Sequence, residues 1–212
     1  MTVWAVVVAA GSSQRFGRPK LYEQLAGRRV LDWSLDAARL ACDGVVLVVP
    51  PELVPAAEPG ADLVVAGGAT RSASVRCGLA AVPTGAEVVV VHDGARPLAG
   101  AKLFTAVLEA VRAGADGAVC AVPVADTVKR VEAGRVVGTV ERAGLWAVQT
   151  PQAFSAAVLR QAHAGAGEAT DDAGLVEAAG GLVVVVDGDP HNLKLTGPVD
   201  LVVAEALVAT LP

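Results

Sequence analysis

Short valine-rich runs that recur along the chain constrain its fold more than any other feature. Between most of these runs lie stretches whose apolar residues repeat at intervals of three and four, as they do on one face of a helix. Strands that alternate with helices indicate an α/β protein with a doubly wound, mostly parallel sheet. We expect strands at 3–9, 44–49, 62–66, 87–92, 118–123 and 182–187, and helices at 30–42, 71–82 and 101–113.

Residues 126–142 break this alternation. They form two β-prone stretches around Ala133-Gly134, which predicts a β-hairpin inserted into the α/β scaffold. A hairpin alone is marginally stable in water. We therefore expect it to pack on a second copy of the protein and make a homodimer. A length of 212 residues suits one domain, so we expect a single domain over 1–212, with this hairpin as a dimerisation arm.

The composition excludes several classes of protein. The longest apolar runs, 3–10 and 182–186, are shorter than the roughly 20 residues of a membrane helix. The first four residues carry no basic region typical of a signal peptide. Three widely spaced cysteines suggest neither disulfides nor zinc, and a net charge of -5 without a basic run does not suit nucleic acid. We expect a cytoplasmic protein with no membrane or nucleic-acid partner.

A glycine-containing loop follows the first predicted strand, at the sheet edge where α/β proteins bind ligands. Small residues there let backbone N–H groups approach phosphate oxygens, and Arg15 and Lys20 add positive charge. The spacing of Gly11 and Gly17 matches neither the dinucleotide fingerprint nor the P-loop, which disfavours dehydrogenases and ATPases. The loop predicts a phosphate site; an ordinary βα loop with solvated charges is the alternative.

The same loop resembles a known signature. Ala9-Ala10-Gly11, followed by Arg15 and Pro19-Lys20, is similar to the loop of nucleotidyltransferases that activate sugar phosphates. Four further motifs narrow the resemblance to the 2-C-methyl-D-erythritol 4-phosphate cytidylyltransferase family of the non-mevalonate isoprenoid pathway. These are GGATRSASV at 67–75, HDGARP at 92–97, RAGLWAVQTPQAF at 142–154 and NLK at 192–194. The resemblance covers essentially the whole chain and implies a Rossmann-like nucleotidyltransferase fold.

The resemblance also implies a reaction and a set of site residues. The reaction would transfer a cytidylyl group from CTP to the polyol phosphate 2-C-methyl-D-erythritol 4-phosphate, releasing pyrophosphate. Arg15 and Lys20 would stabilise the α-phosphate, and Arg142 and Lys194 would hold the acceptor. Mg²⁺ would be held mainly by the CTP phosphates, with Asp93 as its protein ligand. The remaining implied contacts are Ala9, Ala10, Gly11, Gly67, Gly68, Ser74, Asp93 and Gly94 for the nucleotide, and Arg96, Thr127 and Thr150 for the acceptor.

Other interpretations of these motifs stay open. The 67–75 segment could be a Gly-Gly turn with a helix cap, and Thr170-Asp171-Asp172 could be only a helix N-cap. We expect His92 to be a structural strand residue. Many relatives carry Asp where this chain has Ala69, which puts a ribose contact there in doubt. The chain could also use ribitol 5-phosphate, another sugar phosphate or another nucleotide, or it could be a non-catalytic nucleotide-binding module.

Overall fold

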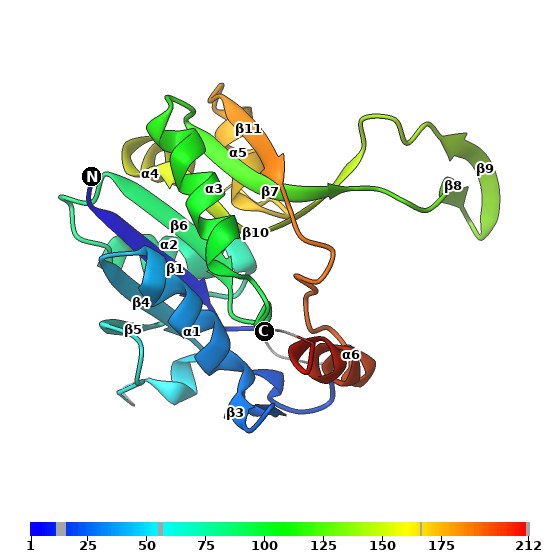
Figure 1. Cartoon of the computed structure of the whole chain (residues 1–212). Coiled ribbons are helices and arrows are strands. Elements are labelled where there is room, and N and C mark those ends of the chain that lie inside the picture. Colours follow the sequence, from blue (N-terminus) through cyan, green and yellow to red (C-terminus); the bar gives the residue numbers. More distant parts are fainter. Residues whose placement is uncertain (12–15, 55–56, 166, 211–212) are drawn as a thin grey trace.

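A seven-stranded sheet forms the centre of the molecule (Figure 1). The computed structural model describes residues 1–11, 16–54, 57–165 and 167–210. Neighbouring strands are parallel except around β10, which runs antiparallel to both β6 and β7. The strand order is β11-β7-β10-β6-β1-β4-β5, with β1 (Val3–Val8), β4 (Gly44–Val49), β5 (Leu63–Ala66), β6 (Val88–Asp93), β7 (Gly117–Pro123), β10 (Trp146–Ser155) and β11 (Val183–Asp187).

Helices cover both faces of this sheet. One face packs against α1 (Val30–Ala41) and α3 (Ala101–Arg112), with α6 (Pro198–Val208) contributing to the same core. The other packs against α2 (Arg71–Ala81), α4 (Ala156–Ala162) and α5 (Asp172–Ala178). Successive residues of a strand point to opposite faces, so β1 sends Ala5 and Val7 into the first core and Val6 into the second. Burial on both faces explains why the inner parallel strands β1, β4 and β6 are continuous valine-rich runs.

Short elements connect the first strand to α1. The 3₁₀ helix η1 (Lys20–Tyr22) is followed by a small two-stranded sheet, β2 (Gln24–Leu25) and β3 (Arg28–Arg29). A second 3₁₀ helix, η2 (Pro51–Leu53), follows β4. Because Leu21 is buried in the core against α1, η1 is fixed to the body of the protein and carries Lys20 with it.

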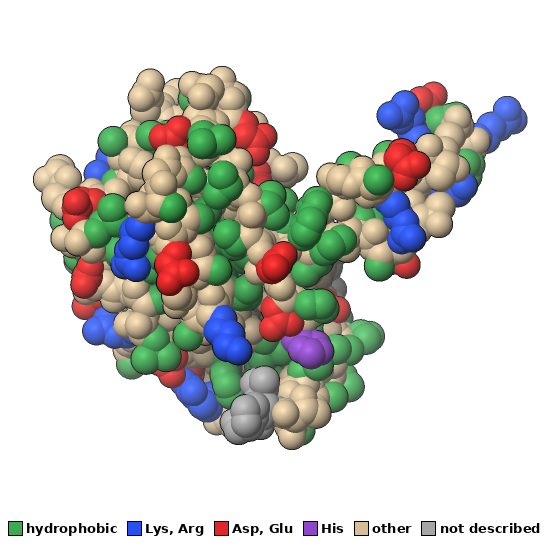
Figure 2. Space-filling model, turned by 45° about the horizontal axis from the view of Figure 1, so that its top comes forward, with side chains coloured by type: hydrophobic (Ala, Val, Ile, Leu, Met, Phe, Trp, Pro, Cys, Tyr) green, Lys and Arg blue, Asp and Glu red, His purple; other side chains and the backbone are tan. Residues whose placement is uncertain are grey.

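The predicted hairpin is confirmed. Strands β8 (Val128–Glu132) and β9 (Arg135–Val140) pair antiparallel. The turn between them has positive φ at Ala133 (46°) and Gly134 (78°), as two-residue hairpin turns require. We call residues 124–145, the hairpin with the segments that join it to β7 and β10, the arm. The arm projects from the body of the chain (Figure 1), and its surface mixes charged and apolar side chains (Figure 2).

Every strand and helix predicted from the sequence is confirmed, with ends that differ by at most two residues. Strand β10 was not predicted: its sequence was interpreted only as a motif, although it lies between β6 and β7 in the middle of the sheet. Two predicted helix caps are present. Thr70 accepts a hydrogen bond from Ala73 N at 3.0 Å at the start of α2, and Asp171 accepts one from Gly174 N at 3.0 Å at the start of α5. None of the helices in the described part of the chain is both long and apolar enough to cross a membrane.

Candidate active site

A cleft of about 660 Å³ opens at the carboxyl ends of β1 and β6, the edge where α/β sheets bind ligands. Its size is typical of a small-molecule site. It brings together the loop after β1, the start of α2, the end of β6 and the segment before α6. The lining residues are Val8, Ala10, Gly11, Lys20, Leu21, Gly68, Ala69, Thr70, Arg71, Ser74, Asp93, Ala95, Lys194 and Thr196.

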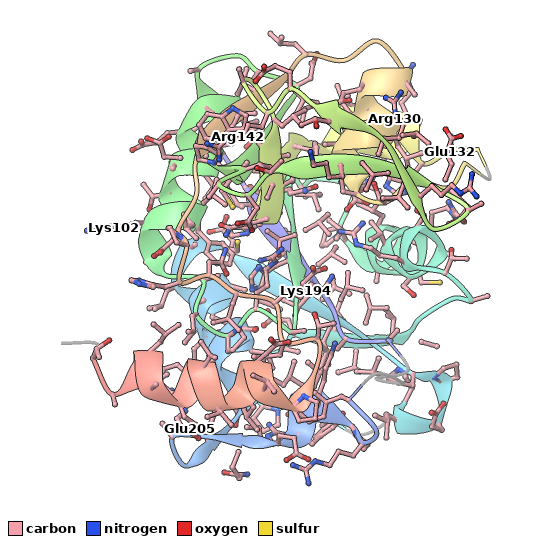
Figure 3. The ribbon with its side chains drawn as sticks, turned by 90° about the vertical axis from the view of Figure 1, so that its right-hand side faces the viewer. Lys102, Arg130, Glu132, Arg142, Lys194 and Glu205 are labelled. Atoms are coloured by element: carbon pink, nitrogen blue, oxygen red, sulfur yellow. The ribbon has the colours of Figure 1, made fainter. Side chains whose placement is uncertain are left out.

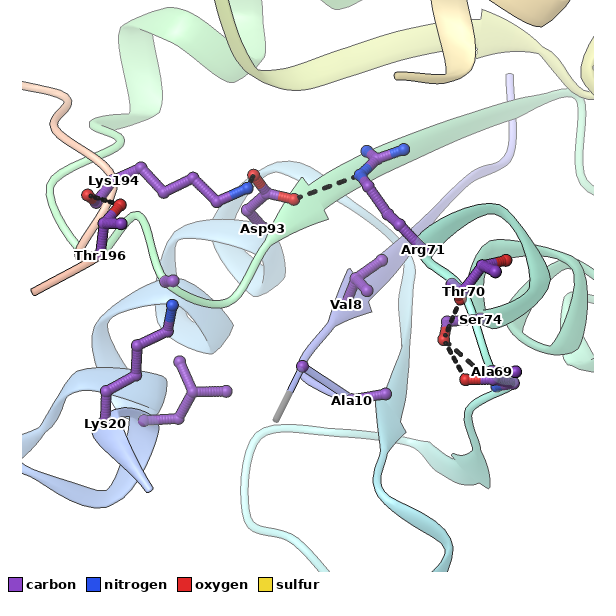
Figure 4. Close-up of a pocket in the computed structure, with 14 residues that line it drawn as sticks. Val8, Ala10, Lys20, Ala69, Thr70, Arg71, Ser74, Asp93, Lys194 and Thr196 are labelled. Carbon is purple, nitrogen blue, oxygen red and sulfur yellow. Dashed lines mark hydrogen bonds and ion pairs between the residues drawn. The ribbon is translucent and has the colours of Figure 1, made fainter. Parts of the chain in front are cut away.

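Asp93 is the acidic group of this cleft, and cations surround it (Figure 4). Its Oδ2 lies 2.7 Å from Lys194 Nζ and 3.8 Å from Arg96 Nε. Its Oδ1 lies 3.7 Å from Arg71 Nε. Burial would raise the pKa of Asp93, but the positive charges of Lys194, Arg71 and Arg96 outweigh burial and lower the pKa to about 2. The carboxylate is therefore ionised at neutral pH.

Two predicted lysines meet in the same cleft although they lie at opposite ends of the sequence. Lys20 enters from η1 and Lys194 from the segment before α6, and both line the cavity (Figure 4). Exposed backbone at Gly11 and Gly68 lines it as well. The combination of lysine side chains with small residues suits an anionic, phosphate-bearing ligand.

The glycines before α2 are required by close packing. A Cβ added to Gly67 would lie 2.4 Å from Ala10 Cβ, and one added to Gly68 would lie 2.5 Å from Ala73 Cβ. Ser74 Oγ donates to Thr70 O at 2.8 Å and accepts from Gly68 N at 3.2 Å. This segment is thus a Gly-Gly turn with a helix cap, and it also forms one wall of the cleft.

Other predicted residues lie just behind the cleft. Arg96 donates to the backbone carbonyl of Asn192 at 2.6 Å, which ties β6 to the segment that carries Lys194. The Thr150 hydroxyl is buried, accepts from Asp93 N at 3.0 Å and lies 3.1 Å from His92 Nδ1. Ala9, Gly67 and Gly94 are neighbours of lining residues but are not themselves among them. The ligand contacts assigned to these five positions stay predictions.

His92 is a structural residue, as expected. Its side chain is fully buried on β6, and its ring lies 5.2 Å from that of Phe104 on α3. Burial is the largest cause that lowers the pKa of His92, to about 4, so the imidazole is neutral at pH 7.

The two arm residues assigned to the acceptor are not part of the cleft of their own chain. Thr127 and Arg142 are exposed, and neither lines the cavity in the part of the chain that the structure describes. Arg142 Nη1 donates to the carbonyl of Ala125 within the arm. Figure 3, seen from the arm side, shows Arg142 on the arm and Lys194 on the body. Arg15 lies outside the described residues.

Sequence reasoning missed one charged lining residue, Arg71. It stood inside a quoted motif, yet no role was assigned to it. The available signal was its position as the first residue of a helix that follows a Gly-Gly turn at the ligand edge of the sheet.

The fold and the cleft define a class: an α/β protein that binds phosphorylated ligands at the carboxyl edge of a mostly parallel sheet. Comparison with known proteins narrows this class. The model of the 2-C-methyl-D-erythritol 4-phosphate cytidylyltransferase family matches residues 3–210. A curated member from Rhodococcus jostii (strain RHA1) is 47% identical over 215 residues, covering 97% of this chain and 95% of the relative. One from Prochlorococcus marinus (strain MIT 9313) is 45% identical over 222 residues, which cover 96% of this chain and 97% of the relative.

Comparison with solved structures indicates the same family. The crystal structure of 2-C-methyl-D-erythritol 4-phosphate cytidylyltransferase from Thermus thermophilus matches with a TM-score of 0.86 and 41% identity, over 99% of this chain and all of that one. The chain belongs to the 2-C-methyl-D-erythritol 4-phosphate cytidylyltransferase family.

Proposed function

We propose that this chain transfers the cytidylyl group of CTP to 2-C-methyl-D-erythritol 4-phosphate, giving 4-diphosphocytidyl-2-C-methyl-D-erythritol and pyrophosphate. Family membership supports the substrates. The observation that carries the proposal for this chain is the cleft itself, where Lys20, Lys194 and Asp93 meet beside exposed glycine backbone. A triphosphate and a phosphate monoester both require such a cationic pocket.

The reaction needs alignment and charge stabilisation more than it needs a base. A phosphate monoester has a second pKa of about 6 and is already a nucleophilic dianion at neutral pH. Its oxygen forms a bond to the α-phosphorus of CTP while the bond from that phosphorus to pyrophosphate breaks. Lys20 would stabilise the charge that develops on the α-phosphate, together with Arg15. Lys194 would hold the acceptor phosphate in line.

The residues of the cleft fit a magnesium ion carried by the nucleotide. Asp93 is an ionised oxygen ligand, the type that Mg²⁺ prefers, and its Oδ1 faces Arg71 Nε only at 3.7 Å, beyond hydrogen-bond distance. No group of three or more His, Cys, Asp or Glu side chains could hold a metal within the described ranges, so triphosphate oxygens and water would supply the other ligands. When bound, Mg²⁺ would neutralise charge and make pyrophosphate a better leaving group.

The arm supports a homodimer in which each subunit completes the site of its partner. Three of its valines are more than half exposed: Val131 (55%), Val136 (64%) and Val137 (51%). Burial of such side chains against a second copy would be favourable. The same arrangement would carry Thr127 and Arg142 to the partner's cleft, since neither residue reaches the cleft of its own chain. A cytoplasmic location remains an expectation from the sequence.

Pyrophosphate release by the purified protein tests the proposal. We expect release only when CTP, Mg²⁺ and 2-C-methyl-D-erythritol 4-phosphate are all present. A panel with ribitol 5-phosphate as acceptor and with ATP, GTP and UTP as donors tests the substrate assignment. Preferred turnover of another pair would replace these substrates, and CTP binding without turnover of any acceptor would favour a non-catalytic module.

A further inference from the structure

Arg71 lies between two carboxylates that belong to different parts of the molecule. Its Nη1 is 2.8 Å from Asp172 Oδ2 at the start of α5, and its Nε is 3.7 Å from Asp93 Oδ1 in the cleft. The Arg71 side chain is 23% exposed. One guanidinium group thus connects the cleft to the helical layer behind it (Figure 4 shows the contact with Asp93).

Asp172 is a rigid anchor for this arginine. Its side chain is fully buried, and its second oxygen, Oδ1, lies 3.0 Å from His163 Nε2. Its neighbour Asp171 caps α5, so the backbone that carries Asp172 is fixed as well. Removing the charged partner of a buried carboxylate strongly destabilises the folded protein, because a buried charge is left without compensation. Arg71 therefore stays paired with Asp172.

This pairing limits what Arg71 can do in the cleft. Its charge is balanced by Asp172, so Arg71 offers phosphate groups less positive charge than an unpaired arginine would. Figure 4 shows Arg71 beside Asp93 and on the opposite side of it from Lys194. The two oxygens of Asp93 thus face different cations: Oδ2 faces Lys194 at 2.7 Å and Oδ1 faces Arg71 at 3.7 Å.

We infer that Arg71 is a positioning residue that sets the orientation of the Asp93 carboxylate, and that Asp172 in turn fixes Arg71. With Arg71 in place, rotation of the Asp93 carboxylate would move an oxygen away from one cation or the other. Lys194 is then held at a defined place through Asp93. The inference rests on the proposed function, because it assigns Arg71 a role in ordering the groups that act on the acceptor.

The variant Arg71→Lys tests whether Arg71 orients the Asp93 carboxylate or only balances the charge of Asp172. Lysine keeps a positive charge for Asp172, so the thermal midpoint should stay within a few degrees of wild type. A single ammonium lacks the planar fork and cannot face Asp172 and Asp93 at once. Removing a side chain that orients a metal ligand typically lowers metal affinity or activity about 10–100-fold. We therefore expect kcat/KM for the acceptor to fall at least about ten-fold. CTP affinity, measured by calorimetry without acceptor, should change by less than about two-fold.

Two further variants serve as a control and as a test of the Asp172 anchor. Arg76→Lys is the matched control, because Arg76 lies on the same helix and binds Gly167 O and Glu168 Oε1 at 2.9 and 2.8 Å without lining the cleft. It should keep wild-type kinetics. Asp172→Asn removes the anchoring charge at a buried position behind the cleft, and it should reproduce the kinetic defect of Arg71→Lys.

Wild-type kinetics in Arg71→Lys would overturn the inference, since Arg71 would then be only a counter-ion. A parallel loss of CTP affinity would also overturn it, because Arg71 would then contact the nucleotide. If the wild-type protein fails to release pyrophosphate from CTP and 2-C-methyl-D-erythritol 4-phosphate, the proposed function fails. The inference is then decided by crystal structures of wild type and Arg71→Lys, where an unmoved Asp93 carboxylate would refute it and a rotated one would support it.

Discussion

At the scale of single residues, Lys20 is the described cation that the proposed reaction assigns to the α-phosphate. Lys20→Ala should lower kcat by about 10²–10³-fold, because it removes a donor that stabilises charge in the transition state. Steady-state pyrophosphate release measures this change, and circular dichroism checks that the protein is folded. Lys102→Ala, at the exposed start of α3, is the matched control and should not change turnover. Near-normal turnover in a folded Lys20→Ala protein would remove Lys20 from the mechanism.

His92 should make the stability of the fold depend on pH. Its folded pKa of about 4 is below the ordinary value of 6.5, so below pH 6.5 the unfolded state binds a proton that the folded state does not. Stability from this residue is complete above pH 6.5 and declines as pH falls towards 4. Between pH 6.5 and 5 the decline is about 2 kcal/mol.

Urea unfolding at several pH values measures this dependence, and His92→Gln is the comparison because glutamine does not titrate. The variant should be less stable at pH 7, since it disturbs the contact with Thr150, but its stability should change less between pH 6.5 and 5. Equal pH slopes for the two proteins would show that His92 titrates normally.

Most of the charged groups in the cleft could be predicted from the sequence, with Arg71 as the exception, but the way their neighbours hold them could not. Lys20 and Lys194 were predicted from motifs, and they line one cavity. The contact of Arg96 with Asn192 and that of Thr150 with His92 depend on side chains brought together only by the fold. Hydrogen-bond partners of this kind lie far apart in the sequence and leave no local pattern.

At the scale of elements, predictability follows the environment of each strand. The inner parallel strands β1, β4 and β6 are largely buried on both faces, and they are continuous valine-rich runs that sequence inspection finds. Strand β10 contains Gln149, Pro151 and Gln152, residues that argue against a central strand, and its register shifts between Val148 and Gln152. Its place between β6 and β7 is set by long-range pairing, so no local pattern could predict it.

Close packing of α2 on the sheet should make Gly78 intolerant of a side chain. A Cβ at Gly78 would lie 2.5 Å from Val6 Cγ1 and 2.9 Å from Val48 Cγ2, both on buried strands. Gly78→Val should therefore lower the free energy of unfolding by about 2 kcal/mol or more. Gly138→Val is the control, because an added Cβ on β9 meets nothing within 4 Å. Equal urea midpoints for the two variants would contradict this packing.

At the scale of the whole molecule, topology makes part of the site predictable. The segments after β1 and β6 follow parallel strands, and such loops meet at one edge of a sheet. The arm is different. The hairpin was predicted from the sequence, but the proposed contribution of Thr127 and Arg142 to a partner's cleft would depend on an assembly of two chains. A sequence specifies such an assembly only through surfaces whose contacts are long-range. The homodimer was therefore expected only from the marginal stability of a lone hairpin, and the acceptor contacts of Thr127 and Arg142 were taken from the family resemblance.

Mixing two inactive variants tests whether the arm acts on the partner subunit. Lys20→Ala removes a cation from the cleft, and Arg142→Ala removes the proposed acceptor-binding arginine from the arm. If Arg142 serves the partner, a mixed dimer has one site with both defects and one intact site. Random pairing of equal amounts then restores about a quarter of wild-type activity. If Arg142 serves its own chain, every site carries a defect and mixing restores nothing.

The experiment requires co-expression with two affinity tags and isolation of the mixed dimer, which should keep about half of wild-type pyrophosphate release. Arg130→Ala on strand β8 of the same arm is the matched control and should keep activity, because the family resemblance gives it no part in the site. Recovery in the mixed dimer would place Arg142 across the interface, since no other arrangement yields an intact site from these two chains. A monomer in sedimentation equilibrium at assay concentration would rule out the shared site, because the arm of one chain could not reach the cleft of another.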